Sequence, residues 1–206
     1  ERFPAPFAES FERYVQTLVE TCQRLVEEDG YQIVFTPHLL TSGDLEVGRL
    51  LRASLPEDSL LLLHEEVPAI YHGADLGHPA LLAGVYEKLH LVLGQRLHSV
   101  ILPWAMGTPV VSLSTTRSNG WMQELFGSPK DQHIDLFDFD RECRTERFVS
   151  AVRAASSERD ALSAQAKARK AELVEIARRE TRALVNDTLG TLRVKSHPFV
   201  QEVAAR

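Results

Sequence analysis

The chain has 206 residues, of which 44% are hydrophobic and 25% are charged, and its formal net charge is −6 at pH 7. This length suits one large domain or a domain with a helical extension, and the composition predicts a buried core. A net negative charge without a clustered excess of lysine and arginine argues against a nucleic-acid groove. The one dense basic stretch, residues 167–170, lies on a predicted helix and indicates a solvated helix face.

Two cysteines, Cys22 and Cys143, lie far apart and have no metal-ligand spacing. Cys22 falls on the apolar face of a predicted helix, so we expect a buried thiol there. No disulfide framework is indicated, and we therefore expect a reducing compartment, the cytoplasm. We find neither a signal-peptide pattern nor an apolar run of membrane-spanning length, which predicts a soluble chain that does not span a membrane.

The chain is predicted to begin with a helix followed by a strand. Apolar residues spaced three and four apart predict an amphipathic helix over residues 10–29, with Ser10 as its candidate N-cap and Gly30 as its stop. Residues 31–36 (YQIVFT) are β-branched and aromatic and predict a buried strand. His38 follows this strand near its carboxyl end.

Further helices and strands alternate along the chain. In chain order, the patterns predict a helix over 44–55 with Asp44 as its N-cap, a strand over 60–63, a helix over 79–88, a strand over 90–93, a helix over 97–106 stopped by Gly107, a strand over 109–113, a short helix over 119–126 and a small strand over 134–137. From about residue 145 to 189 the pattern is long, polar and helical, with one break.

Alternating helices and short apolar strands predict a Rossmann-like α/β fold, a parallel sheet with helices on both faces. We place this domain at residues 1–144 and assign residues 145–206 to a C-terminal helical extension that packs on the same domain. Ligands of such sheets bind beyond the carboxyl ends of the strands. His38 and the loops at 94–98 and 114–119 are therefore candidates for the site.

The strongest local signal is the run LVLGQRLHS, residues 91–99. Gly94 lets the backbone turn tightly from a strand into a helix. Arg96, Leu97 and His98 then form the first helical turn, where free N–H groups and the helix dipole favour an anion. Arg96 adds a planar fork for a carboxylate or phosphate, and His98 can exchange a proton near neutral pH. The segment predicts a site for an anionic substrate with acid chemistry; the alternative is an arginine paired with a local carboxylate and a histidine capping a loop.

A second candidate segment is SLSTTRSNG, residues 112–120. Its hydroxyl groups and its cation, among them Ser114, Thr115 and Arg117, come after a strand and before a helix. Such a loop can bind phosphate through its side chains and the following helix N-terminus. Ordinary loop composition accounts for the same residues equally well.

A third candidate segment is FTPHLLTSGD, residues 35–44, in which His38 follows a strand. A lone histidine at such a position is more often structural than functional. No metal site is predicted, because the other histidines show no metal-ligand spacing. The chain also has no P-loop, no GxGxxG after a strand, no GxSxG and no HExxH.

Taken in order, these segments resemble the polysaccharide pyruvyl transferase family. The run LVLGQRLHSVILPWAMGTPVVSLS, residues 91–114, resembles the family's strand ending in glycine, its x-Arg-Leu-His, its helix and the Gly-x-Pro-x-x of its next strand. Upstream, IVFTPH and the later Asp44 resemble the family's strand, Pro-His and aspartate. The resemblance spans roughly residues 11–138, and Arg-Leu-His is its most specific part. Arg117 stands where the family often has lysine, which keeps the charge and changes the hydrogen-bond geometry.

This resemblance implies one half of a two-domain enzyme of the GT-B-like fold, with the site in the cleft between the halves. The implied reaction transfers pyruvate from phosphoenolpyruvate to a sugar of a cell-surface polysaccharide or glycan, as a ketal. No metal or organic cofactor is implied, and phosphoenolpyruvate and the sugar acceptor are the expected partners. His98 maps onto the family's proposed general acid, and the residues assigned to substrate binding are His38, Gly94, Arg96, Leu97, Ser114, Thr115 and Arg117.

By the same resemblance, the N-terminal half of the cleft is not found in these 206 residues. We therefore expect a missing N-terminal half-domain or partner subunit, or else a divergent and inactive relative. The chain by itself is expected to fold and to have little or no transferase activity.

Two other functions stay open. A nucleotide-sugar glycosyltransferase or sugar-nucleotide epimerase would share the fold, but many such transferases place a glutamate before the Gly-x-Pro segment, where this chain has Pro103, Trp104 and Ala105. The other is a non-catalytic binding module whose long C-terminal helix docks a partner. Phosphate release in the presence of sugar acceptors distinguishes catalysis from binding.

Overall fold

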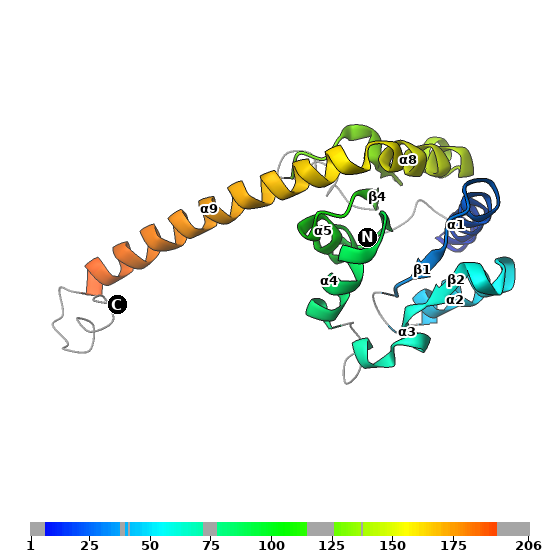
Figure 1. Cartoon of the computed structure of the whole chain (residues 1–206), viewed down its shortest axis with the longest axis horizontal. Helices are drawn as coiled ribbons and strands as arrows, with labels where there is room; N and C mark the ends of the chain where they lie inside the picture. The colour runs from blue at the N-terminus through cyan, green and yellow to red at the C-terminus, as the bar shows by residue number, and fades with distance from the viewer. Residues whose placement is uncertain are drawn as a thin grey trace. The chain divides into compact units, whose positions relative to one another are not determined.

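The computed structural model describes residues 7–37, 40, 42–71, 78–114, 126–136 and 138–192. Its residue contacts divide the chain into two compact units, Glu1–Lys167 and Ala168–Arg206. The first unit holds the described strands (Figure 1). The described part of the second unit is the continuation of one helix, α9 (Arg159–Leu192). The sequence-based division at residues 144 and 145 stays a prediction.

The described elements confirm an α/β chain. In order, they are α1 (Phe7–Asp29), β1 (Ile33–Phe35), α2 (Ser42–Ser54), η1 (Glu57–Ser59), β2 (Leu60–Leu62), α3 (Leu63–Glu66), η2 (Pro68–Tyr71), α4 (Pro79–Lys88), β3 (Val92–Gly94), α5 (Leu97–Met106), β4 (Val110–Ser114), η3 (Lys130–Gln132), β5 (His133–Asp135), α7 (Phe139–Glu142), α8 (Thr145–Ser157) and α9, where η denotes a 3₁₀ helix.

Several boundaries agree with the sequence patterns. The helices α4 and α5 have the predicted bounds, and α5 ends at Gly107, whose φ of 81° is left-handed. The long C-terminal helical pattern is broken once, at Glu158, between α8 and α9. Glycine ends α5 because a left-handed residue at a helix C-terminus costs least when it has no Cβ.

Two predicted N-caps are wrong. Ser10 lies inside α1, which begins at Phe7, and its side chain is buried. Asp44 lies in the first turn of α2, which begins at Ser42. Both helices extend further toward the N-terminus than the first polar residue of their pattern, because helix starts are set by the flanking chain as much as by a single capping side chain.

The strands are short and shifted relative to their predicted ranges. β1 and β2 have three residues each, and Leu63, predicted to end a strand, begins the short helix α3. Residues 119–125 of a predicted helix lie outside the described residues, as does residue 137 of the last predicted strand. α3 and α7 are too short to produce a helical period in the sequence.

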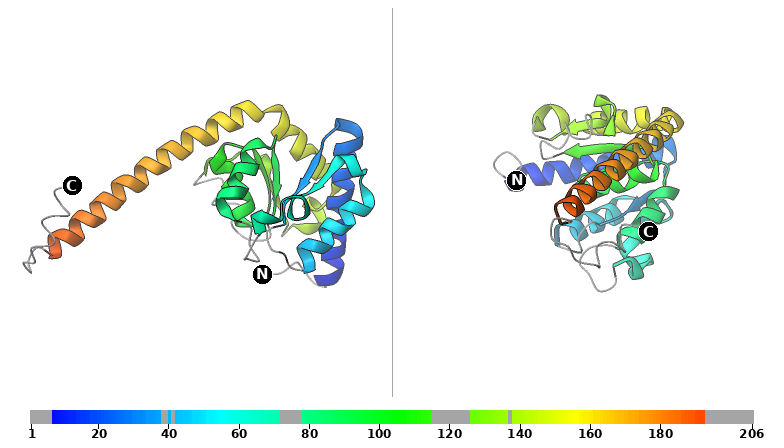
Figure 2. Two further views of the ribbon diagram at one scale, coloured as in Figure 1. Left: turned by 60° about the horizontal axis from the view of Figure 1, so that its bottom comes forward. Right: turned by 90° about the vertical axis from the view of Figure 1, so that its left-hand side faces the viewer.

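The pairings among the described strands are all parallel, as predicted, but these strands form two sheets. β1 pairs with β2, with Ile33 opposite Leu60. β3, β4 and β5 form a second sheet in that order, with Val92 opposite Val110 and Ser112 opposite His133. The prediction of one sheet is wrong for the described strands, since β1 and β3 are not hydrogen-bonded to each other. Figure 2 shows β1 and β2 together beside α1 and α2, and the other sheet beside α5.

Side-chain contacts, rather than a backbone ladder, connect the two sheets. The rings of Tyr31 and His90 meet edge to face, with centroids 6.0 Å apart, near the amino ends of β1 and β3. Near the carboxyl end of β1, the hydroxyl groups of Thr36 and Tyr86 are 3.4 Å apart. A strand pattern in the sequence indicates which residues are extended, whereas pairing between distant strands depends on these tertiary contacts.

The main core lies where α1 and α8 pack together and against the second sheet. Val111 and Ile134 of the sheet and Phe148 of α8 are fully buried. The thiol of Cys22 on α1 is buried, as predicted, and burial raises its pKa to about 12. Such burial of apolar side chains is the main favourable contribution to folding.

Ion pairs also connect α1 to α8 at the surface. Glu28 accepts hydrogen bonds from Arg24 at 2.8 Å and from Arg153 of α8 at 2.7 Å, and Arg153 also reaches Asp29 at 2.9 Å. The hydrogen bonds from Arg24 and Arg153 lower the pKa of Glu28 to about 2. Glu28 therefore keeps its charge at neutral pH.

Among the described residues, no helix is both long enough and apolar enough to cross a lipid bilayer.

Candidate active site

Gly94 determines how β3 turns into α5. A Cβ atom on this residue would lie 2.5 Å from the carbonyl oxygen of Ser99 and 3.0 Å from a methyl group of Val100. The backbone of Gly94 does not have a positive φ. Glycine is therefore needed here for the close approach of strand and helix, and not for a left-handed conformation.

Ser99 fixes the first turn of α5. Its hydroxyl group accepts a hydrogen bond from the backbone N–H of Arg96 at 3.0 Å and donates one to the backbone carbonyl of Arg96 at 2.7 Å. Arg96 precedes the helix as its N-cap residue, with extended backbone angles. Ser99 thus holds both the backbone N–H and the backbone carbonyl of Arg96, the residue from which the guanidinium projects.

Arg96 forms an ion pair with Asp44 of α2. Nη2 of Arg96 donates to Oδ1 of Asp44 at 3.3 Å, and the side chains are 46% and 21% exposed. The two residues are 52 positions apart and come from elements that follow β1 and β3. Arg96 is thus paired with a carboxylate, but with one that is distant in the chain and not with a local one.

Two tyrosines hold the chain after β1. The hydroxyl group of Tyr71 donates to the carbonyl oxygen of Pro37 at 2.9 Å. The hydroxyl group of Tyr86 on α4 contacts that of Thr36. The backbone carbonyl of Tyr86 accepts a hydrogen bond from the hydroxyl group of Thr108 at 2.7 Å. Burial raises the pKa of both tyrosines, so their hydroxyl groups stay protonated at neutral pH.

A cavity of about 450 Å³ extends from this region between β1 and β3. Its walls are mostly apolar and come from α1, α2 and the two strands, and they include Phe11, Leu18, Ile33, Phe35, Leu91 and Leu93. Asp44, Arg96 and the buried Tyr14 are among its polar lining residues. A mostly apolar cavity with a few convergent polar groups is the usual form of a ligand site.

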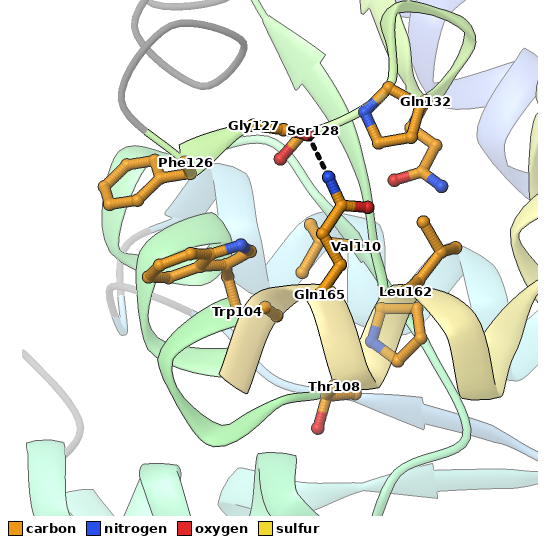
Figure 3. Close-up of a pocket in the computed structure, with 12 residues that line it drawn as sticks. Trp104, Thr108, Val110, Phe126, Gly127, Ser128, Gln132, Leu162 and Gln165 are labelled. Carbon is orange, nitrogen blue, oxygen red and sulfur yellow. Dashed lines mark hydrogen bonds between the residues drawn. The ribbon is translucent and has the colours of Figure 1, made fainter. Parts of the chain in front are cut away.

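A second pocket, of about 20 Å³, lies elsewhere in the first unit (Figure 3). The rings of Trp104 and Phe126 pack with centroids 4.3 Å apart, and Gln165 of α9 donates to the carbonyl of Gly127 at 2.6 Å. None of the predicted site residues lines this pocket. These contacts connect α5, the loop after residue 126 and the first turns of α9, which indicates that the residues around this pocket have a structural role.

The described part of the chain contains no group of three or more His, Cys, Asp or Glu side chains placed to hold a metal ion.

Comparison with known families identifies the family of this chain. A family model described as polysaccharide pyruvyl transferase matches residues 2–117, which is more than half of the chain. The chain belongs to the polysaccharide pyruvyl transferase family. Comparisons with curated proteins and with solved structures give no match.

The pyruvyl transferase match takes in both Asp44 and the start of α5. At the start of α5 the structure brings together Gly94, Arg96 and two exposed residues, Leu97 and His98. Ser114 ends β4, which pairs in parallel with β3. The carboxyl ends of β3 and β4 therefore lie at the same edge of their sheet. The remaining predicted residues, His38, Thr115 and Arg117, lie outside the described residues.

The sequence does not predict that Asp44 pairs with Arg96. The sequence indicates a helix cap at Asp44 and a resemblance to the family's aspartate, and an acidic residue at a helix start already has a sufficient local explanation. One signal could have indicated its place. In the single parallel sheet that the sequence predicts, the helix after the first strand begins at the same edge as the loop at 94–98, so an acidic first turn would be expected near Arg96. In the structure β1 and β3 lie in separate sheets, and the ion pair joins the segments that follow them.

Proposed function

We propose that this chain is a pyruvyl transferase domain that transfers pyruvate from phosphoenolpyruvate to a sugar of a polysaccharide or glycan. Membership of the family supports the reaction class. The observation that carries the proposal is the start of α5, where Arg96 and His98 flank one helix N-terminus inside the matched region.

The donor suits the groups found there. Phosphoenolpyruvate carries a carboxylate and a phosphate, and the free N–H groups of the α5 N-terminus favour an anion. Nε and Nη1 of Arg96 have no hydrogen-bond partner among the described residues, so the guanidinium retains donors for a second anion. We assign phosphoenolpyruvate binding to Arg96 and to the backbone N–H groups of this turn.

The chemistry follows from the donor. A proton from the His98 imidazolium to the methylene carbon of phosphoenolpyruvate makes the adjacent carbon an oxocarbenium-like centre. A sugar hydroxyl group attacks that carbon, and attack by a second hydroxyl displaces phosphate and closes the ketal. The helix N-terminus stabilises the departing phosphate. In this proposal the domain is one half of a GT-B-like enzyme, and Ser114, Thr115, Arg117 and His38 contribute to the same cleft.

Calorimetry on the chain tests the donor. Phosphoenolpyruvate should bind more tightly than pyruvate, because its phosphate adds a second anionic group, and Arg96→Lys should weaken its binding, because a point charge replaces a planar fork. Release of phosphate with sugar acceptors tests the transfer. Binding of a UDP-sugar with no response to phosphoenolpyruvate would favour a nucleotide-sugar glycosyltransferase instead.

A further inference from the structure

The ion pair between Asp44 and Arg96 uses only part of the guanidinium group. The contact joins Nη2 to one carboxylate oxygen at 3.3 Å, and no other described residue accepts a hydrogen bond from the Arg96 side chain. A carboxylate that occupied the fork would contact two nitrogen atoms. Asp44 therefore leaves donors of Arg96 available to a second anion.

Asp44 is the more firmly placed of the two residues. It lies in the first turn of α2, where the helix dipole and free N–H groups stabilise a carboxylate. Its side chain is 21% exposed, against 46% for that of Arg96. An arginine side chain has many rotamers, and holding it in one of them before binding reduces the entropy that binding must offset.

The ion pair between Asp44 and Arg96 lies beside a mostly apolar cavity. Asp44 and Arg96 line the same cavity as Tyr14, which is buried on α1. Burial, then Cys143 and Cys22, and then the charge of Asp44 raise the pKa of Tyr14, while the charge of Arg96 lowers it. The pair thus lies beside a neutral phenol at the edge of an apolar cavity, where charge interactions are screened less than in open water.

We propose that Asp44 is a positioning residue that orients the guanidinium of Arg96 for the donor's carboxylate. The proposal rests on the proposed function, since it assigns a role within the same site. Asp44 does not touch the donor; it fixes Arg96 from α2, the helix that follows β1, while Ser99 fixes the backbone of Arg96 from α5. The fork then faces a planar carboxylate with its remaining donors.

Binding measurements on the chain test this role. Asp44→Asn should weaken the binding of phosphoenolpyruvate and of pyruvate by about tenfold, the scale of a lost hydrogen bond to a charged group. The affinity for inorganic phosphate should decrease less, because a tetrahedral anion accepts hydrogen bonds from many directions. The matched control is Glu46→Gln on the same helix, whose carboxylate pairs with Arg49 at 3.3 Å at the surface. It should leave all three affinities unchanged.

NMR and a second variant separate positioning from folding. The Nε–H signal of Arg96 should be observable in the wild type and broadened by motion in Asp44→Asn. Asp44→Glu, which keeps the charge one methylene further out, should restore part of the phosphoenolpyruvate affinity. If Asp44→Asn does not fold, the same comparison is made with Asp44→Glu alone, which should bind phosphoenolpyruvate more weakly than the wild type.

The outcomes are distinct. Tighter phosphoenolpyruvate binding by Asp44→Asn would mean that Asp44 competes with the donor, and unchanged binding would mean that it has no part in the site; either overturns the proposal. The proposed function fails separately, if Arg96→Lys also leaves phosphoenolpyruvate binding unchanged. Weaker binding of Arg96→Lys together with unchanged Asp44→Asn removes only the role of Asp44.

Discussion

At the carboxyl end of β3, a single missing methyl group decides how closely the chain can turn into α5. The site where a Cβ of Gly94 would lie is 2.5 Å from the carbonyl oxygen of Ser99, a backbone atom that cannot swing aside as a flexible side chain can. The same Ser99 holds the peptide groups of Arg96 through its hydroxyl. Residue choice at 94 and 99 thus sets the position of the proposed anion site.

Gly94→Ala should therefore lower the free energy of unfolding by about 1–3 kcal/mol, the range for forced overpacking. Denaturant unfolding measures it. The matched control is Gly84→Ala in α4, where a Cβ would meet nothing within 4 Å. There alanine should stabilise the chain by up to about 1 kcal/mol, from its higher helix propensity. Equal effects of the two substitutions would contradict the close-approach argument.

His98→Gln tests the proposed acid in an active form of the enzyme. Glutamine can still hydrogen-bond but cannot deliver a proton, so kcat should fall at least about a hundredfold while phosphoenolpyruvate affinity is largely kept. His78→Gln, an exposed histidine before α4, serves as control. A raised KM with an unchanged kcat would assign His98 to phosphate positioning.

Helices were more predictable than the sheet. α4 and α5 have the predicted bounds, because their patterns are strong and their ends carry local signals, a proline at the first position of α4 and Gly107 after α5. Local pattern does not specify which strands pair, so the separation of β1 from β3 could not be predicted. The same limit applies to the site. Arg96 was identified from its local context, whereas Asp44 reaches it only through tertiary structure.

The glycine that ends α5 allows a prediction about the stability of this helix end. Gly107 has a φ of 81°, and a Cβ there would lie 2.6 Å from Cε of Lys167 on α9. Gly107→Ala should cost about 1–2 kcal/mol of unfolding free energy, the penalty for a left-handed residue with a Cβ. Because the Lys167 side chain is flexible and can move, Lys167→Ala should recover little of that loss. Full recovery in the double variant, measured by denaturant unfolding, would show instead that the side-chain contact is responsible.

For the first unit as a whole, the sheets differ in how completely they are covered. Leu113, Ile134 and Val111 of the second sheet are almost fully buried, while all three residues of β1 are only partly buried. The cavity between β1 and β3 accounts for the difference. Stability therefore resides mainly around α1, α8 and the second sheet, and the region that carries the proposed site is the less densely packed one, as is common for ligand-binding regions.

The well-packed side of this unit contains a histidine that links its stability to pH. His133 of β5 is buried, and neither ring nitrogen makes a hydrogen bond of normal geometry with a described residue. Burial lowers the pKa of His133, and the backbone of Ser128 and the carboxylate of Asp131 offset part of that effect. The backbone carbonyl of His133 accepts a hydrogen bond from Arg147 at 3.1 Å, which ties the backbone of β5 to α8.

A lowered pKa in the folded state means that the unfolded chain takes up this proton first as the pH falls. The stability that neutral His133 provides is present in full above the ordinary histidine pKa of about 6.5, and it is lost as the pH decreases from there through the lower folded-state pKa. One proton gives a slope of at most about 1.4 kcal/mol per pH unit. His133→Leu should remove this slope and leave stability near pH 8 almost unchanged, because leucine fills a buried site where the ring nitrogens make no hydrogen bond of normal geometry with a described residue. Denaturant unfolding of both proteins between pH 5 and pH 8, with the exposed His78→Gln as control, measures the difference. A difference between wild type and His133→Leu that stays constant across that range would show that His133 is protonated equally in the folded and unfolded chains, and the pH dependence would then have to come from other groups.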